Sequence, residues 1–192
     1  MKNFIKKTFY KIFPKKVYRV RRGIAKGFKR KGGFDFIPTL KKQSNEVKFL
    51  VSLNLENKVI YDIGANVGMF TIYFSKSVDP KGKIFSFEPN PNAYQDLLTN
   101  IELNNLENIK TFQLGVGKSE YKDQLIFDPY STGIGSLNKE IQANLILRDS
   151  VKKVEIDIIS VDYIIKKEGL LFPDFIKIDV EGLEYNVIKG MK

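Results

Sequence analysis

Short apolar runs alternate with amphipathic segments along most of the chain. Residues 58–64 (KVIYDIG) form one continuous apolar run, and residues 83–89 (KIFSFEP) form a second. Runs of this kind are typical of strands that are covered on both faces in a parallel sheet. Apolar residues at helical spacing follow each run, over 68–77 and over 91–105. The pattern therefore predicts a strand, helix, strand, helix order, with Asn90 as the cap of the second helix.

A third apolar run, residues 108–115 (NIKTFQLG), predicts another strand that ends at Gly115. The pattern then changes, because residues 152–160 (KKVEIDIIS) alternate between apolar and charged positions. Together with residues 124–128 (QLIFD) and the glycine- and serine-containing stretch 131–138 (STGIGSLN), this alternation predicts an antiparallel hairpin or flap.

The C-terminal quarter returns to the first pattern. Ser160 is placed to cap a helix over 161–169, which Gly169 would close. Residues 174–182 (DFIKIDVEG) then predict a fourth core strand with acidic residues at its exit, and residues 45–53 predict a helix that leads into the sheet. The fold class expected from this order is α/β, a Rossmann-like doubly wound parallel sheet.

In such sheets, ligands bind outside the carboxyl ends of the strands. The predicted strand ends bring Asp62, Gly64–Gly68, Glu88, Gly115 and the acids of 179–181 to one rim. Backbone N–H groups of the first turn would favour a negative group such as a carboxylate or phosphate. Glu88 is placed to accept both hydroxyls of a ribose. These features predict a nucleoside ligand with a polar tail.

Two classes of nucleoside compete for this rim. A dinucleotide fingerprint needs glycines at its first, third and sixth places, which here are Gly64, Asn66 and Met69, so two of the three fail. The observed pattern from Asp62 is D-x-G-x-N-x-G. The dinucleotide reading stays open as an alternative that predicts binding of NADH.

Three segments carry a family resemblance. VIYDIGANVGMF (59–70), FSFEPNP (85–91) and FIKIDVEGLEYNVIKG (175–190) together resemble the FkbM-type S-adenosylmethionine-dependent methyltransferases, and LGVG (114–117) is similar to the exit of their third strand. The resemblance covers about residues 45–192. It implies a class I methyltransferase fold with S-adenosyl-L-methionine as the cofactor.

Carried over position by position, the resemblance implies three groups of cofactor contacts. The turn after the first strand would surround the methionine part, Glu88 would bind the ribose, and the third-strand exit would approach the adenine. A rim acid beside N–H donors would also suit the zwitterionic methionine better than pyrophosphate. The residues so implied are Asp62, Gly64, Asn66, Val67, Gly68, Glu88, Asn90, Leu114, Gly115 and Val116.

The chain contains no histidine and no cysteine, so carboxylates, lysines, tyrosines and hydroxyls are the groups left for chemistry. The resemblance implies O-methylation of a sugar, glycan or other small-molecule hydroxyl, for which a nearby base is useful. Asp179 and Glu181 are the expected catalytic carboxylates, and Glu184 either joins them or stabilises a helix N-terminus. We expect no metal site, although Asp179 and Glu181 as ligands of a divalent cation are an alternative.

The basic residues are unevenly distributed. Residues 1–33 carry 13 of the 32 Lys and Arg residues and no acid, so the remainder of the chain is slightly acidic. We interpret 1–33 as a basic amphipathic helical arm and 34–192 as the methyltransferase domain. The arm would either touch an anionic membrane through residues 1–31 or pack on its own domain. Nucleic acid is not an expected partner, since no groove-reading motif follows.

The usual methyltransferase architecture continues beyond the predicted fourth strand with one more parallel strand and an antiparallel pair. Without them, FIKID (175–179) would be an apolar edge that is prone to self-association. The alternatives are a longer reading frame, a partner chain, or the flap as a cover. A cytoplasmic location is expected, and a non-catalytic nucleotide-binding or membrane-associated module is the alternative to an enzyme.

Overall fold

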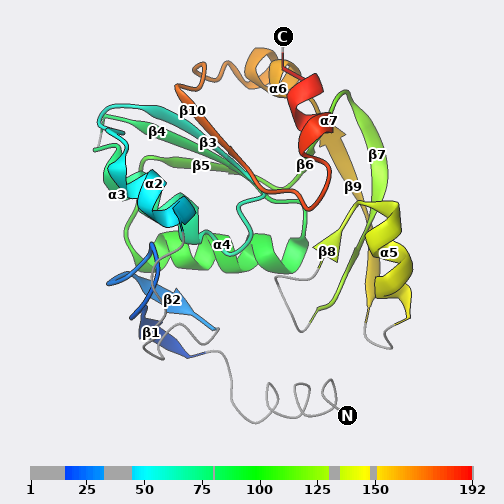
Figure 1. Ribbon diagram of the computed structural model, residues 1–192, viewed down its shortest axis with the longest axis horizontal. Helices are drawn as coiled ribbons and strands as arrows, with labels where there is room; N and C mark the ends of the chain where they lie inside the picture. Colours follow the sequence, from blue (N-terminus) through cyan, green and yellow to red (C-terminus); the bar gives the residue numbers. More distant parts are fainter. Residues whose placement is uncertain (1–15, 33–44, 80, 130–134, 148–150, 192) are drawn as a thin grey trace.

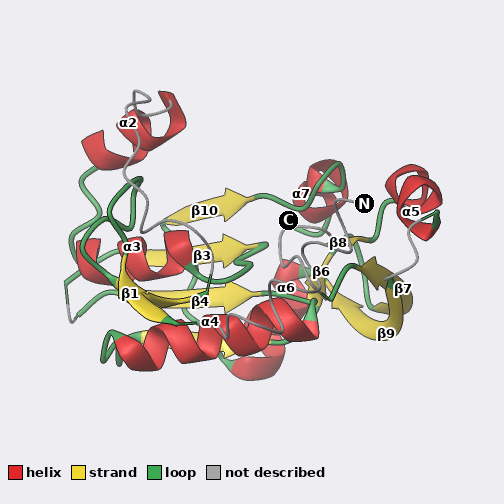
Figure 2. Cartoon of the chain, turned by 90° about the horizontal axis from the view of Figure 1, so that it is seen from below, coloured by secondary structure: helices red, strands yellow, loops and turns green. Residues whose placement is uncertain are grey.

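The computed structural model describes residues 16–32, 45–79, 81–129, 135–147 and 151–191. These residues form a central parallel sheet, a second sheet beside it, and a small hairpin under the first sheet (Figure 1). Seen from below, the strands of the parallel sheet run in one direction toward the second sheet (Figure 2).

The parallel sheet confirms the predicted doubly wound fold. The first three of its strands in the chain lie in sequence order, and the last strand pairs on the other side of the first. The helix before that last strand therefore crosses the opposite face of the sheet. In spatial order the strands are β10 (Phe175–Ile178), β3 (Val59–Ile63), β4 (Lys83–Phe87) and β5 (Ile109–Phe112).

Alternate residues of each strand enter two separate cores. Ile60 and Ile84 pack with the helices on one face, and Tyr61 and Phe85 pack on the other. Each fully buried side chain of this size contributes about 1.5–3 kcal/mol. The first face is covered by α2 (Asn45–Ser52) and α3 (Met69–Ser77), and the second by α6 (Val161–Glu168) and α7 (Glu184–Lys189).

The predicted helix caps are confirmed. Asn90 caps α4 (Pro91–Leu103) by accepting the N–H groups of Asn92 and Ala93. Ser160 caps α6 through the N–H of Tyr163, and Gly169 ends that helix in the left-handed conformation, with φ of 61°. The helices predicted over 161–169 and 45–53 are present as α6 and α2.

The alternating residues form the predicted antiparallel hairpin. β7 (Tyr121–Phe127) pairs with β9 (Lys152–Ile159), and the second sheet also contains β6 (Gly115–Val116) and β8 (Gly135–Ser136). Helix α5 (Lys139–Ile146) packs beside β7 and β8.

The third strand is shorter than predicted. It ends at Phe112 in β5, and Gly115 belongs instead to β6, where it pairs in parallel with Ile158 of β9. A Cβ at Gly115 would lie 2.4 Å from Ile158 Cδ1, so glycine lets β9 approach here. The chain thus changes sheets at the point where the single strand was predicted to end.

The basic segment is not helical in its described part, which corrects the predicted helical arm over that stretch. Residues 16–32 form a hairpin of β1 (Val17–Arg19) and β2 (Lys29–Lys31). Gly23 and Gly27 have φ of 70° and 93°, which permits the chain reversal. Residues 1–15 of the expected arm lie outside the described residues, and the domain division at residue 33 stays a prediction.

Two side chains, Asn100 of α4 and its C-cap residue Asn104, hold this hairpin by its backbone. Asn104 accepts the N–H of Lys29 at 2.9 Å and donates to the carbonyl of Lys29 at 2.7 Å. Asn100 accepts the N–H of Lys31 at 2.9 Å. The hairpin therefore rests on the C-terminal half of α4, far along that helix from its cap at Asn90.

β10 is the outer strand of the parallel sheet within the described ranges, as expected, and it pairs there with β3 alone. Self-association through it stays a prediction. Of the helices in the described residues, none combines the length and apolar character that a membrane span needs.

Candidate active site

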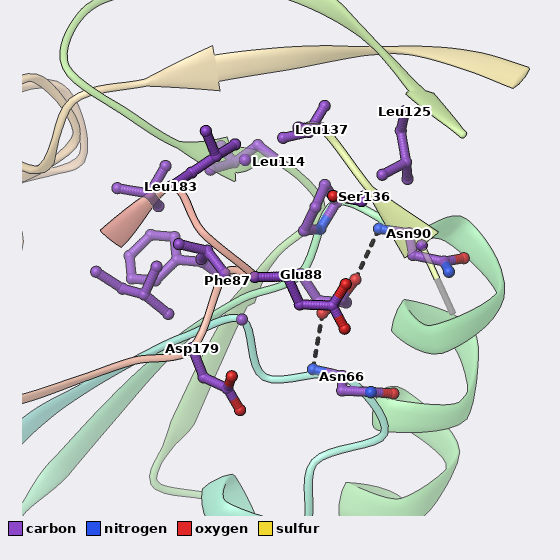
Figure 3. Close-up of a pocket in the computed structure, with 18 residues that line it drawn as sticks. Asn66, Phe87, Glu88, Asn90, Leu114, Leu125, Ser136, Leu137, Asp179 and Leu183 are labelled. Atoms are coloured by element: carbon purple, nitrogen blue, oxygen red, sulfur yellow. Dashed lines mark hydrogen bonds between the residues drawn. The ribbon is translucent and has the colours of Figure 1, made fainter. Parts of the chain in front are cut away.

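A cavity lies where the carboxyl ends of β3, β4 and β10 meet the second sheet (Figure 3). Most of the predicted site residues line it together: Gly64, Asn66, Glu88, Asn90, Leu114, Gly115, Val116, Asp179 and Glu181. The rule that ligands bind beyond the carboxyl ends of parallel strands thus located this cavity correctly.

Glu88 stands at the middle of the cavity wall. Its Oε2 accepts the N–H of Asn66 at 2.7 Å, and its Oε1 accepts the N–H of Asn90 at 2.8 Å (Figure 3). The residue is only 7% exposed, and this burial is the main reason that its pKa rises to about 7. A carboxylate has about four lone-pair directions, so each oxygen keeps the capacity to accept a ligand hydroxyl.

The turn after β3 differs from the expected anion site. The N–H groups of Gly64 and Ala65 both donate to the carbonyl of Phe87 at 3.0 Å, and that of Asn66 donates to Glu88. These three donors are therefore engaged within the protein. Asn66 is in the left-handed conformation, and its Oδ1 is buried with no hydrogen-bond partner among the described residues. That oxygen is enclosed by protein atoms and is not exposed to the cavity.

Position 64 requires a glycine because the turn after β3 and the exit of β10 approach each other closely there. Its φ is 78°, and a Cβ there would lie 2.0 Å from the carbonyl oxygen of Asp179. The exit of β10 is consequently pressed against the turn after β3. This contact brings the rim acids of β10 to the cavity.

Asp62 does not line the cavity, in contrast to its expected contact with the methionine part of a cofactor. It is fully buried on the α3 face of β3, because side chains alternate along the strand and Asp62 lies two residues from Ile60. Its Oδ2 accepts the hydroxyl of Thr71 at 2.6 Å, and its Oδ1 lies 3.2 Å from Lys177 Nζ in an ion pair. Asp62 is thus a buried residue next to the cavity that binds Thr71 and Lys177.

Val67 and Gly68 are likewise outside the cavity lining. The carbonyl of Val67 accepts the side-chain amide of Asn100 at 2.8 Å. Gly68 precedes α3 with φ of 85°, and a Cβ there would lie 2.4 Å from Leu97 Cδ1. Both residues therefore connect the turn to α4.

The acids after β10 have different surroundings. Asp179 lies on the rim with a side chain that is 63% exposed, 3.5 Å from Lys177 Nζ. Glu181 has a left-handed backbone with φ of 50°, and burial followed by the charges of Asp179 and Glu184 raises its pKa. Glu184 accepts the N–H of Gly182 at 3.1 Å at the start of α7, which favours its structural role over a place in the cavity.

The sequence revealed Leu114 but not the rest of the apolar side of the cavity. Leu114, Leu137 and Leu183 lie together on the side opposite Asn66 (Figure 3). Leu137 follows β8, where the sequence showed only a glycine- and serine-containing flap. The remaining lining residues that were not predicted are Ile63, Phe87, Pro89, Leu125, Gly135, Ser136 and Val180.

The lining has a clear electrostatic character. Three of its residues, Glu88, Asp179 and Glu181, carry carboxyl groups, and none of the described lining residues is lysine or arginine. In the part of the chain that the structure describes, no three acidic side chains gather in a way that could hold a metal ion. The cavity therefore favours ligands that bring positive charge and hydroxyl donors.

A family model for the methyltransferase FkbM domain matches residues 62–192. The chain belongs to the FkbM methyltransferase family. This confirms the resemblance seen in the three sequence segments, and the FkbM match begins at Asp62, the residue that opens the D-x-G-x-N-x-G pattern.

Curated relatives cover similar fractions of the chain. It is 28% identical over 148 residues to Methyltransferase 1 of Beauveria bassiana and 30% identical over 159 residues to Methyltransferase sdnD of Sordaria araneosa, which cover 71% and 70% of this chain. The hexuronic acid methyltransferase AglP of Haloferax volcanii is 28% identical over 155 residues and covers 81% of it. The chain spans about three fifths of these relatives, namely 59%, 61% and 59% of their lengths.

A solved FkbM methyltransferase from Methylobacillus flagellatus aligns with 73% of this chain and 30% of its own, at 20% sequence identity and a TM-score of 0.48. A methyltransferase from Aquifex aeolicus, described as dependent on S-adenosylmethionine, aligns with 39% of this chain and 40% of its own, at 20% identity and a TM-score of 0.35.

Proposed function

We propose that this protein binds S-adenosyl-L-methionine and transfers its methyl group to a hydroxyl of a sugar, a glycan or another small molecule. The observation that carries the proposal is the cavity lining, which combines three carboxyl groups with no basic side chain among its described residues. When bound, this cofactor supplies an electrophilic methyl group on a positively charged sulfur. An acid-lined cavity stabilises such a cation relative to water.

Individual residues fit the remaining parts of the cofactor. Glu88 is proposed to accept the two ribose hydroxyls, since its oxygens keep free lone pairs after binding Asn66 and Asn90. Asn66, which lines the cavity beside Glu88, is proposed to contact the amino-acid part. Leu114, Gly115 and Val116 form an apolar surface suited to the adenine ring.

A dinucleotide fits the same cavity poorly. Its pyrophosphate would need cations or free N–H donors, yet the turn donors at Gly64, Ala65 and Asn66 are engaged within the protein. The carboxyl groups of Glu88 and Asp179 would repel it. This reasoning disfavours the NAD alternative.

Methyl transfer is a displacement that depends on alignment and on the removal of the hydroxyl proton. Asp179 and Glu181 are proposed to serve the acceptor side, because both line the cavity beyond β10. Burial and neighbouring acids raise the pKa of Glu181, which makes its carboxylate a stronger base than an ordinary glutamate.

The class of acceptor is supported by a relative. AglP is named a hexuronic acid methyltransferase, and its similarity covers 81% of this chain. We therefore propose a sugar hydroxyl before other acceptors. The test is methyl transfer from isotopically labelled S-adenosylmethionine to hexuronic acids, neutral hexoses and simple amines. We expect the sugars to be labelled, and labelling of the amines alone would contradict this preference for a sugar hydroxyl.

Calorimetric titration with S-adenosylhomocysteine, the product of the cofactor, is the direct test of the binding function. We expect saturable binding at micromolar concentration and no heat with NADH. Binding of NADH in place of S-adenosylhomocysteine by the folded protein would refute the proposal. Circular dichroism of the same sample establishes that it is folded.

We further propose that the basic hairpin contacts an anionic membrane surface. Residues 16–31 contain eight Lys and Arg residues and no acid, and among them Lys16, Arg19 and Lys29 are exposed. Each cation near an anionic bilayer contributes about 1 kcal/mol. Vesicles containing phosphatidylserine should bind the protein, and the double variant Lys16→Gln/Lys29→Gln should bind less.

The matched control for this surface is Lys166→Gln/Lys167→Gln on α6, which removes the same charge elsewhere. Equal loss in both variants would mean that only net charge matters, and it would sink the hairpin's specific role. Unchanged vesicle binding after deletion of residues 1–33 would do the same.

A further inference from the structure

A buried lysine of β10 contacts both β3 and the turn after β3, next to the cavity. Lys177 lies in the middle of β10, opposite Asp62 of β3 in the strand register, and it is 8% exposed. Its ammonium group donates to the carbonyl of Gly64 at 3.0 Å and lies 3.2 Å from Asp62 Oδ1. It also lies 5.0 Å from the centre of the Phe70 ring of α3.

Two of the groups that Lys177 contacts belong to the cavity, although Lys177 itself does not line it. Gly64 and Asp179 are lining residues, and Asp179 Oδ2 is 3.5 Å from Lys177 Nζ. One ammonium group thus connects the buried acid of β3, the turn after β3 and the rim acid after β10. These segments meet where Gly64 is pressed against the Asp179 carbonyl.

A lysine that served only as the counter-ion of Asp62 would need one partner. Asp62 is already fixed on its other oxygen by Thr71, which also lies 3.1 Å from Ser86. The ammonium group instead divides its contacts between Asp62 and the two cavity-lining residues. A long cation arranged in this way sets the position of the exposed carboxylate at the rim.

We infer that Lys177 is a positioning residue for the amino-acid end of the cofactor: it holds the Asp179 carboxylate and the Gly64 carbonyl as a pair of acceptors for the cofactor's ammonium group. The inference rests on the proposed function. Asp179 then replaces Asp62 as the acid that faces the zwitterion, because Asp62 is fully buried.

This assignment moves Asp179 from the acceptor side, where the proposed function puts both rim acids, to the cofactor side. Asp179 forms an ion pair with Lys177 beside the turn, whereas Glu181 lies two residues further along the chain in a left-handed backbone conformation. Glu181 is consequently the carboxylate that is left to accept the proton of the acceptor hydroxyl. The raised pKa of Glu181 agrees with this role.

The test compares two ligands that differ at one end. S-Adenosylhomocysteine carries the amino-acid group, and 5′-methylthioadenosine lacks it but keeps the adenosine and the sulfur. Asp179→Asn changes one exposed side chain, so the fold is not at risk. We expect it to weaken S-adenosylhomocysteine binding at least about tenfold and to leave 5′-methylthioadenosine within about twofold.

Lys177 needs a paired variant, because its removal alone leaves the Asp62 carboxylate buried without a cation. Asp62→Asn/Lys177→Met removes both charges and keeps an acceptor for the Thr71 hydroxyl. Asp62→Asn alone is the matched control, and circular dichroism confirms folding of each variant. The double variant should show the same selective loss as Asp179→Asn, and the control should bind both ligands more nearly as the unaltered protein does.

The outcomes are separable. Equal weakening of both ligands, or of neither, in the double variant would overturn the positioning role while leaving the proposed function intact. Loss of 5′-methylthioadenosine binding in Asp179→Asn would also contradict it. If the unaltered protein bound neither ligand, the proposed function would fail and the inference with it.

Discussion

The carboxylate of Glu88 accepts the backbone N–H of Asn66 at 2.7 Å, so the exits of β4 and β3 are joined by a single side chain. The same carboxylate accepts the N–H of Asn90 at the start of α4. Glu88 therefore holds the wall of the cavity in shape and also presents its oxygens there. Substitutions of Glu88 should therefore affect both the conformation of the turn after β3 and the affinity for the ligand.

Substitution of Glu88 by glutamine should weaken S-adenosylhomocysteine binding. The change removes a charged acceptor for hydroxyl donors, and charge-assisted hydrogen bonds are worth roughly 1.5–3 kcal/mol each, which corresponds to about tenfold or more in affinity. Calorimetric titration measures the change. Glu102→Gln, on the exposed surface of α4, is the control with the same chemistry. An unchanged affinity in Glu88→Gln would refute the ribose assignment.

Binding should also depend on pH near neutrality. The pKa of Glu88 is raised to about 7, chiefly by burial, so its carboxyl group is protonated below that pH and ionised above it. Since the ionised form is the better acceptor for ribose hydroxyls, affinity should be highest above about pH 7 and should fall by up to about tenfold per pH unit below it. Titrations between pH 5.5 and 8.5, roughly spanning that pKa, measure the profile.

The pH effect has an internal control in Glu88→Gln, which has no carboxyl group to titrate. Its affinity should vary less across the same pH range than that of the unaltered protein. Parallel pH profiles for the two proteins would assign the effect to a group other than Glu88.

Gly64→Ala should destabilise the protein beyond the usual effect of adding a side chain at positive φ. The new Cβ would lie 2.0 Å from the carbonyl oxygen of Asp179, whereas a Cβ at Gly169 would have nothing within 4 Å. Gly169→Ala, at φ of 61°, should cost about 1 kcal/mol through backbone strain alone. Gly64→Ala should cost about 2 kcal/mol more, as urea unfolding would measure. Equal costs would mean that β10 and the turn are not pressed together.

Asn104→Ala should release the basic hairpin without affecting the cavity. It removes both hydrogen bonds to the backbone of Lys29, which are together worth roughly 1–3 kcal/mol. Amide hydrogen exchange at Lys29 should become at least about tenfold faster, with S-adenosylhomocysteine affinity unchanged. Thr99→Ala on the same helix is the control. A loss of ligand affinity in Asn104→Ala would show that the hairpin and the cavity are coupled.

The elements of the parallel sheet could be predicted because their signals are local. Continuous apolar runs mark β3 and β4, and Asn90, Ser160 and Gly169 mark helix ends through their own hydrogen bonds or backbone freedom. Glu88 was also predictable, because the first residue after a buried strand reaches the ligand edge of the sheet.

The remaining features depend on partners far away in the chain. Sequence alone did not tell whether Asp62 stands at the ligand edge or inside the sheet, since its ion-pair partner Lys177 comes from β10. Gly115 was assigned to the third strand because nothing local reveals its pairing with Ile158. The basic hairpin was predicted as helix because Val17, Tyr18 and Val20 allow either periodicity, and the backbone contacts with α4 decide the outcome.

Asn100 and Asn104 recognise the hairpin by its main chain, and no side chain of β2 takes part in these hydrogen bonds. Any residue other than proline at positions 29 and 31 offers the same N–H groups. Mutations could therefore exchange the cations of this strand for neutral or acidic residues while the strand stays in place. The charge of β2 is in this way free to evolve separately from the cavity.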